Sequence, residues 1–95
     1  MDRWRDKVVV VTGASSGIGQ AICAELVRGG MIVVGLAKRK DKVEALRASL
    51  FGSDGQLCAI ECDVTSEQQV KQAYSWIEKT RGGIDMLVNN AGVVR

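Results

Sequence analysis

The stretch most suggestive of chemistry is residues 8–19, which read VVVVTGASSGIG: four valines lead directly into a turn with three glycines. Side chains with a Cβ resist the backbone angles that carry a buried strand into a helix within a few residues. We therefore expect Gly13 to form the tight turn, Gly17 to let the backbone approach a pyrophosphate, and Gly19 to let the helix pack closely. The helix N-terminus would offer free N–H groups and a positive dipole end to an anion.

The glycine spacing narrows the kind of anion site. It is G-x-x-x-G-x-G, whereas the commoner dinucleotide fingerprint is G-x-G-x-x-G, and the Gly-Lys-Ser/Thr ending of a P-loop is absent from this turn. The pattern thus disfavours a kinase or an ATPase. The alternative for this motif alone is a glycine-rich turn from strand to helix that binds no ligand.

A second informative segment reads VVGLAKRK, residues 33–40. Proteins that bind NAD normally carry an acidic residue about 20 positions past the glycines, where it holds the ribose 2′-hydroxyl. Ala37 stands in that place, and Lys38 and Arg39 follow. Two cations would accept a 2′-phosphate that a carboxylate would repel, so the segment favours NADP over NAD. The alternative is a solvated basic helix start, and Ser16 adds no further cation in the glycine turn.

Strand and helix patterns alternate along the chain and would position these residues. Runs rich in branched residues predict strands over 7–12, 31–36, 56–62 and 84–89, and the uninterrupted valines indicate a strand buried on both faces. Apolar stripes at helical spacing predict three helices between the strands. These stripes are Ile18, Ile22 and Leu26; Val43, Leu46 and Leu50; and Val70, Ala73 and Ile77, with a capping box of Ser66 and Gln69 before the third helix.

The order β-α-β-α-β-α-β predicts an α/β, Rossmann-type parallel sheet with right-handed crossovers and strand order 3-2-1-4. In that order the first two helices lie on one face of the sheet and the third on the other. A switch point then forms between the first and fourth strands, and open sheets of this kind bind ligands beyond the carboxyl ends of such strands. Residues 1–95 would form one dinucleotide-binding part of a single domain.

Composition excludes several other classes of protein. The net charge of +2 is too small for a nucleic-acid coat or a membrane-seeking face, and no apolar run approaches the length of a membrane span. We therefore expect a cytoplasmic protein that binds neither nucleic acid nor membrane. Three cysteines without any histidine do not resemble a zinc site, so we predict no metal and treat the cysteines as small buried hydrophobes.

Three motifs occur in order: TGASSGIG after the first strand, CDV at residues 62–64 and NNAG at residues 89–92. Together they resemble the short-chain dehydrogenase/reductase family, over residues 7–92. The resemblance implies that Thr12 ties the turn to the fourth strand and that a nicotinamide dinucleotide is bound. The cofactor-binding residues would be Gly13, Ser15, Ser16, Gly17, Ile18, Gly19, Lys38, Arg39, Asp63, Val64, Asn90, Ala91 and Gly92.

The resemblance also gives roles at the ends of the third and fourth strands. Asp63 would accept a hydrogen bond from the adenine amino group, with Val64 beside the ring; the alternative for Asp63 is an acidic residue leading into the third helix. The amides of Asn89 and Asn90 would satisfy backbone groups where the sheet splays, and residues 90–92 would form the floor under the ribose. The alternative is a polar strand end that turns through Gly92.

Within the family, the amino-terminal residues 1–19 and the segment VVGLAK are similar to one group. This group is formed by dehydrogenase/reductase member eleven and the farnesol dehydrogenase-like proteins. That similarity implies a homo-oligomeric parent that acts on small apolar alcohols or carbonyls. The family's catalytic Tyr, Lys, Ser and Asn follow the NNAG strand, and the one tyrosine here, Tyr74, has Glu78 rather than lysine four positions later. We therefore predict helix packing for Tyr74 and no catalytic residue in this chain.

Two hypotheses follow for the function of the chain. The chain is the cofactor-binding half of an NADP-dependent oxidoreductase, inactive by itself, or it is a non-catalytic product that binds a nucleotide weakly or interferes with full-length subunits. In either case we expect the fourth strand to leave an exposed edge, with marginal stability, aggregation or dependence on a partner.

Overall fold

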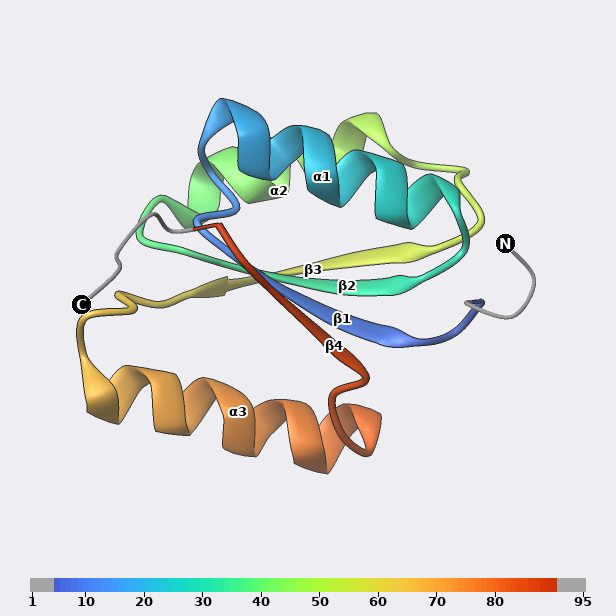
Figure 1. Ribbon diagram of the computed structural model, residues 1–95. Coiled ribbons are helices and arrows are strands. Elements are labelled where there is room, and N and C mark those ends of the chain that lie inside the picture. The colour runs from blue at the N-terminus through green and yellow to red at the C-terminus, as the bar shows by residue number, and fades with distance from the viewer. Residues whose placement is uncertain (1–4, 91–95) are drawn as a thin grey trace.

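The computed structural model describes residues 5–90, so the predicted contacts of Ala91 and Gly92 lie outside the described residues. Four strands alternate with three helices, as the sequence predicts (Figure 1). Strand bounds agree with the predicted ranges to within two residues. The elements are β1 (Val8–Thr12), α1 (Gly17–Arg28), β2 (Ile32–Ala37), α2 (Lys40–Ser49), β3 (Gln56–Glu61), α3 (Glu67–Arg81) and β4 (Met86–Asn89).

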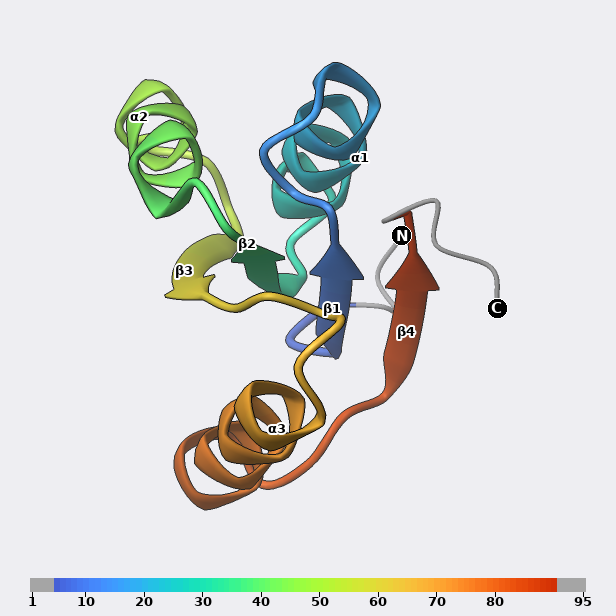
Figure 2. The same cartoon turned by 90° about the vertical axis from the view of Figure 1, so that its left-hand side faces the viewer.

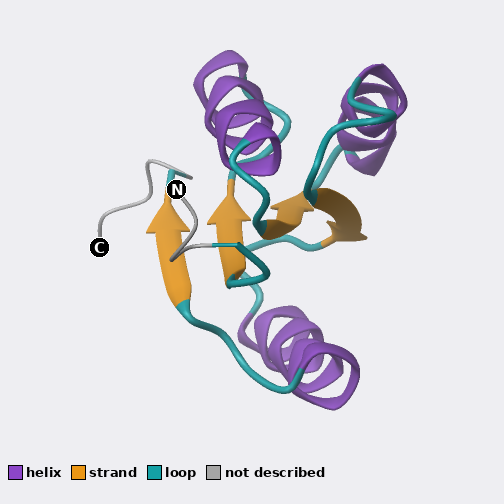
Figure 3. Ribbon diagram, turned by 90° about the vertical axis from the view of Figure 1, so that its right-hand side faces the viewer, coloured by secondary structure: helices purple, strands orange, loops and turns teal. Residues whose placement is uncertain are grey.

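The strands form one parallel sheet in the order β3-β2-β1-β4, which confirms the predicted topology. Helices α1 and α2 cover one face and α3 covers the other (Figure 2). Strands β1 and β4 lie side by side, and Thr12 pairs with Asn89 at their carboxyl ends (Figure 3). The strands β2 and β3 are added on one side of β1, and β4 is added on the other. The switch point of the strand order therefore lies between β1 and β4, beside the glycine turn.

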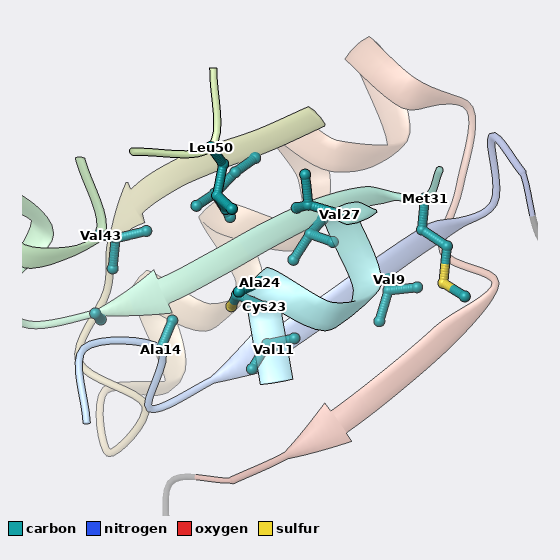
Figure 4. Packing of buried hydrophobic residues seen from close by; sticks show 12 residues of the cluster. Val9, Val11, Ala14, Cys23, Ala24, Val27, Met31, Val43 and Leu50 are labelled. Atoms are coloured by element: carbon teal, nitrogen blue, oxygen red, sulfur yellow. The ribbon is translucent and has the colours of Figure 1, made fainter. Parts of the chain in front are cut away.

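Strand β1 is buried on both faces because it lies between β2 and β4 and beneath helices on either side. Val9 and Val11 belong to the core under α1 and α2 (Figure 4). Val8 and Val10 belong to a second core that includes Ile77 of α3. The alternation follows from the two-residue period of a strand. The sheet therefore separates two apolar clusters, and β1 contributes to both.

The buried face of α1 differs from the predicted stripe. Ile18 is 69% exposed, and Ile22 and Leu26 only flank the core. The face that packs on the sheet instead carries smaller residues, namely Gly19, Cys23, Ala24 and Val27. The sheet is thus covered by the smaller residues of α1, and Ile18 projects away from it. Of the predicted stripe, Ile22 and Leu26 therefore pack against the core, whereas Ile18 lies outside it.

Helix ends follow the predicted cap residues with one correction. Ser66 accepts a hydrogen bond from the Gln69 N–H, as a capping box requires. The Gln69 side chain does not return the bond to Ser66; its Oε1 accepts from the Asp63 N–H at 2.8 Å. Gly82, which ends α3, has φ +81, a left-handed conformation that glycine adopts without strain.

The cysteines are free thiols in the part of the chain described, and Cys23 and Cys62 are buried, whereas Cys58 is partly exposed. Burial raises the pKa of the Cys23 thiol to about 11, which keeps it protonated and unreactive. None of the helices in residues 5–90 is long and apolar enough to span a bilayer.

The outer side of β4 is open among the described residues, because β4 ends the strand order. Leu87 is 51% exposed on this strand, whereas the valines of β1 are buried. Such an edge can pair with another chain, and the open side agrees with the exposed edge that the sequence predicts. Its effect on stability and association stays a prediction.

Candidate functional site

The glycine turn joins the carboxyl end of β1 to the N-terminus of α1. Gly13 has φ +64, which confirms the tight turn. Ser16 caps the helix in an extended conformation, and its Oγ accepts a hydrogen bond from the Gly19 N–H at 3.0 Å. The helix starts at Gly17, so the backbone N–H groups of its first turn lie near the carboxyl end of β1. That turn contains no acidic residue.

Gly17 and Gly19 have different structural reasons to be glycine. A Cβ on Gly19 would collide with the Gly13 carbonyl oxygen and lie 2.9 Å from Asn90 Nδ2, so the turn and the helix touch at this point. A Cβ on Gly17 would meet nothing within 4 Å, and its φ is not positive. The fold itself therefore does not require glycine at 17. The space in front of it is open to an external group.

Thr12 ties β1 to β4 behind the turn. Its Oγ1 donates to Asn89 Oδ1 at 3.0 Å and accepts from the Asn90 N–H at 2.9 Å. These bonds confirm the structural role predicted for Thr12. They join groups 77 and 78 positions apart in the sequence, so they fix the two strand ends against each other.

Asn90 extends this network into the glycine turn. Its Nδ2 donates to the Gly13 carbonyl at 3.3 Å and to Ser16 Oγ at 3.1 Å. Ser16 Oγ in turn donates to the Gly13 carbonyl at 3.0 Å. Both lone pairs and the proton of the Ser16 hydroxyl are thus used inside the protein. Sequence reasoning did not foresee the contact between Asn90 and Ser16, because no local pattern links two residues so far apart.

A pocket of about 360 Å³ lies at the carboxyl ends of β1, β2 and β3. It brings together residues from three separate segments that the sequence analysis singled out. Ala37, at the end of β2, is only 3% exposed, and Lys38 and Arg39 extend from the next two positions into solvent. The lining residues are Gly13, Ser15, Leu36, Ala37, Lys38, Arg39, Cys62, Asp63, Val64 and Thr65.

The Asp63 carboxylate is hydrogen-bonded to Thr65, two positions later in the same loop. Its Oδ1 accepts from the Thr65 N–H at 2.9 Å and from Thr65 Oγ1 at 2.6 Å. These hydrogen bonds, with a smaller contribution from Lys38, hold the pKa of the Asp63 carboxyl below its ordinary value. Its Oδ2 lies 3.8 Å from Lys38 Nζ. Asp63 thus stabilises the loop between β3 and α3 and also lines the pocket.

Arg39 forms an ion pair that the sequence analysis missed. Its Nε and Nη2 donate to Asp41 Oδ1 and Oδ2, each at 3.2 Å. The pairing raises the pKa of the Arg39 guanidinium and lowers that of the Asp41 carboxyl. Both side chains are exposed. The only sequence signal was the single acid Asp41 within the basic run KRKDK, which does not specify which of the four cations it meets.

The remaining predicted residues lie apart from this pocket. The pocket lining does not include Ser16, Gly17, Ile18, Gly19 or Asn90. Asn90 is instead joined to the turn by its hydrogen bond to Ser16. A larger hollow of about 650 Å³ follows β3 and α3 past Trp76, and it contains neither the glycine turn nor the basic pair. The smaller pocket is the candidate site, because the start of the glycine turn, the basic pair Lys38 and Arg39, and Asp63 all line it.

Two further predictions concern catalytic and metal-binding groups. Tyr74 packs on the core beneath α3, as predicted, and does not line the 360 Å³ pocket. Across residues 5–90, no three His, Cys, Asp or Glu side chains are grouped so that they could hold a metal ion.

Comparisons with known proteins agree with this geometry. The model of the short chain dehydrogenase family matches residues 7–95. Farnesol dehydrogenase of Aedes aegypti is 56% identical over the whole chain, which covers 39% of that protein. Human dehydrogenase/reductase SDR family member 11 is 40% identical over the whole chain, which covers 37% of it. Both similarities confirm the group that the sequence resembles.

Solved structures show the same fold with either cofactor. A metagenomic short-chain oxidoreductase in complex with NADP matches 94% of the chain with a TM-score of 0.87 and 35% identity, over 40% of its own length. NAD⁺-bound xylitol dehydrogenase matches 96% of the chain with a TM-score of 0.87 and 33% identity, over 35% of its length. The motifs and the fold of the present chain, with the family match over residues 7–95, show that this chain belongs to the short-chain dehydrogenase/reductase family.

Proposed function

We propose that the chain is the cofactor-binding part of an oxidoreductase that uses NADP in preference to NAD. The observation that carries this proposal is the composition of the 360 Å³ pocket. The glycine turn forms one wall, and neutral Ala37 with the cations Lys38 and Arg39 forms another. A group that combines a pyrophosphate with a further phosphate about one ribose away matches this distribution of charge.

The glycine turn fits a dinucleotide pyrophosphate on structural grounds. The open space at Gly17 would admit a bound group, and the N–H groups of the first turn of α1 would face it. Gly13, Ser15, Gly17, Ile18 and Gly19 would surround the phosphates and the adjacent ribose. Ser16 would support them indirectly, because its hydroxyl is already used by the turn and by Asn90.

Asp63, Val64 and Asn90 would contact the rest of the cofactor. Val64 would lie beside the adenine ring, and Asp63 Oδ2, which does not bond Thr65, would accept from the adenine amino group once Lys38 turns to the cofactor. Asn90 would form part of the ribose floor, which we extend to Ala91 and Gly92 from the family pattern. The bound nicotinamide supplies hydride transfer, and this chain's residues hold and orient the cofactor for it.

The preference for NADP follows from charge. Ala37 leaves no carboxylate to hold a ribose 2′-hydroxyl or to repel a 2′-phosphate at the end of β2. Arg39 offers a planar fork of donors that suits a phosphate, and Lys38 offers a mobile point charge. Both side chains are exposed, so they can turn toward a ligand.

The reaction we propose for the whole protein is hydride transfer between NADP(H) and a small apolar alcohol or carbonyl. The supporting observation is the similarity to an enzyme named farnesol dehydrogenase, over 39% of its length. We also propose that the whole protein is a cytoplasmic homo-oligomer, as the family resemblance implies.

A second candidate is a chain that binds the cofactor without turnover. The sequence has one tyrosine, Tyr74, which packs against the core and is followed four positions later by Glu78. The family's Tyr-x-x-x-Lys is therefore not formed by these residues. The 95-residue chain should not oxidise NADPH with a panel of carbonyls, and turnover abolished by Gly17→Asp would contradict this candidate.

The cofactor proposal is tested by calorimetry on the complete protein that contains this chain. NADP should bind more tightly than NAD, and Lys38→Ala with Arg39→Ala should remove most of the difference, on the order of tenfold or more for two phosphate contacts. The matched control is Lys71→Ala with Lys79→Ala on α3, which removes the same charge away from the pocket. An unchanged NADP-to-NAD ratio in the Lys38/Arg39 variant would refute the preference.

A further inference from the structure

We propose that Asp41 limits the preference for NADP, because its carboxylate holds the Arg39 guanidinium that a 2′-phosphate would bind. This inference rests on the proposed function and deepens it. It concerns a residue outside the pocket lining and outside the motifs of the sequence. Asp41 would act through Arg39, so it is a positioning residue that does not itself contact the cofactor.

The geometry of the pair is the first argument. Two donors of Arg39, Nε and Nη2, each lie 3.2 Å from a different oxygen of Asp41. This is the fork-to-fork arrangement by which arginine also binds phosphate. A carboxylate and a phosphate therefore compete for the same edge of the guanidinium. The phosphate must break both hydrogen bonds or bind the remaining donors on Nη1 and Nη2.

The contrast with Lys38 is the second argument. Lys38 Nζ lies 3.8 Å from Asp63 Oδ2, a single long contact, and Asp63 is already satisfied by Thr65. The ammonium can turn toward a phosphate at little cost. Arg39 must first break two hydrogen bonds to Asp41 before the same edge of its guanidinium can turn to a phosphate. The two cations that favour NADP are thus unequally available, and Asp41 is the reason for the difference.

Helix stability offers another explanation for Asp41, and it makes a different prediction. Asp41 lies in the first turn of α2, where a negative charge is favoured by the helix dipole, and Arg39 at the N-cap makes no side-chain capping bond. If helix stability were its only role, its removal would lower the unfolding midpoint and leave the cofactor ratio unchanged. The ratio therefore separates the two explanations.

The experiment measures dissociation constants for NADP and NAD by calorimetry on the complete protein. Asp41→Asn should tighten NADP about threefold, the size expected for removal of one exposed ion pair, and leave NAD unchanged. Asp41→Ser, which retains a residue favoured at helix N-termini, should give the same result if the helix start is sensitive to Asn. Both folds are checked by circular dichroism.

Two controls show whether the effect passes through Arg39. Glu44→Gln removes the same charge from the same helix but from a residue that pairs with Lys40 and Arg47, so it should change the ratio little. In an Arg39→Ala background, Asp41→Asn should have no effect on the ratio. A gain that persists without Arg39, or one that Glu44→Gln reproduces, would overturn the inference in favour of a general charge effect.

The outcomes also separate this inference from the proposed function. If the Lys38/Arg39 double variant abolishes the NADP preference and neither Asp41 variant raises the ratio, the inference is wrong and the proposed function stands. If the double variant leaves the ratio unchanged, the proposed function fails and this inference fails with it. A rise with Asp41→Asn that disappears in the Arg39→Ala background supports both.

Discussion

The glycine turn and the basic segment, residues 38–41, lie at the same edge of the sheet but are held in place by different means. The turn is fixed by a left-handed Gly13 and by part-buried hydrogen bonds that join it to β4. The charged side chains of the basic segment are held by exposed ion pairs between close neighbours or across to Asp63. A rigid backbone suits a group common to every dinucleotide, and mobile side chains suit the group that differs.

The comparison suggests that the two regions tolerate change differently. Alteration of the turn disturbs packing and therefore the free energy of unfolding, because its atoms are in contact with β4. Alteration of the basic segment changes selectivity at little structural cost, because surface ion pairs stabilise a fold weakly. Four experiments test this division, in order of expected effect.

The largest effect is expected for Gly19→Ala. The new methyl group would overlap the Gly13 carbonyl and crowd Asn90, so the free energy of unfolding should fall by about 2–3 kcal/mol. Gly17→Ala is the matched control, with open space around its Cβ, and should change unfolding by less than about 1 kcal/mol while weakening cofactor binding. Urea denaturation measures both. Equal destabilisation by the two variants would contradict the distinct roles of these glycines.

Thr12→Val should have the next largest effect. It removes the hydroxyl that bonds Asn89 and Asn90 while keeping the shape of the side chain. Loss of partners for these part-buried groups should lower the free energy of unfolding by about 1–3 kcal/mol. Thr80→Val is the control, because its hydroxyl bonds only the Trp76 carbonyl on the exposed side of α3. A Thr12 variant as stable as the Thr80 variant would show that the strand ends do not depend on this link.

A higher salt concentration should weaken the contribution of the basic segment to cofactor binding more than that of the glycine turn. The Lys38 and Arg39 side chains are exposed, so their attraction to a 2′-phosphate is screened at high ionic strength. Raising NaCl from about 0.05 to about 0.5 M should therefore reduce the NADP-to-NAD affinity ratio several-fold. Calorimetry at the two salt concentrations measures it. A ratio that does not change with salt would mean that a less exposed group discriminates between the cofactors.

The smallest effect is expected from Asp63 as the pH falls. Its pKa lies below the ordinary 3.8, mainly because of Thr65, so its charged form is favoured by folding. The stabilisation is present above the unfolded pKa and is lost as the pH falls below 3.8 through the lower folded value. Asp63→Asn should lower the urea midpoint slightly at pH 7 and not at about pH 2. A difference that persists at the lower pH would assign the effect to shape and not to charge.

Much of the fold was predictable because its signals are local. The valine run, the cap residues and the helical stripes depend on neighbours within a few positions, and they placed every strand to within two residues. The stripe of α1 placed the helix, and Ile22 and Leu26 pack against the core, but Ile18 is 69% exposed. Gly19 and Cys23 lie on the buried face instead, and periodicity alone does not determine which of two neighbouring faces packs on the sheet.

The candidate site was predictable in composition but not in its pairings. The glycine turn, the basic pair and Asp63 were identified as separate motifs. That Asp63 bonds Thr65, that Asn90 bonds Ser16 and that Arg39 is held by Asp41 became visible only in the structure. Several side chains within reach offer equally suitable charges or amides, so residue type does not determine which partner is chosen.

By itself the sequence determined the strand order, the position of the glycine turn and the absence of an acidic residue at position 37. These follow from periodicity, glycine conformational freedom and the handedness of crossovers, which act along the chain. The tertiary structure decided which groups are available to a ligand. Availability depends on competition among neighbours in space, and Asp41 beside Arg39 shows that a cation present in the sequence is already paired in the fold.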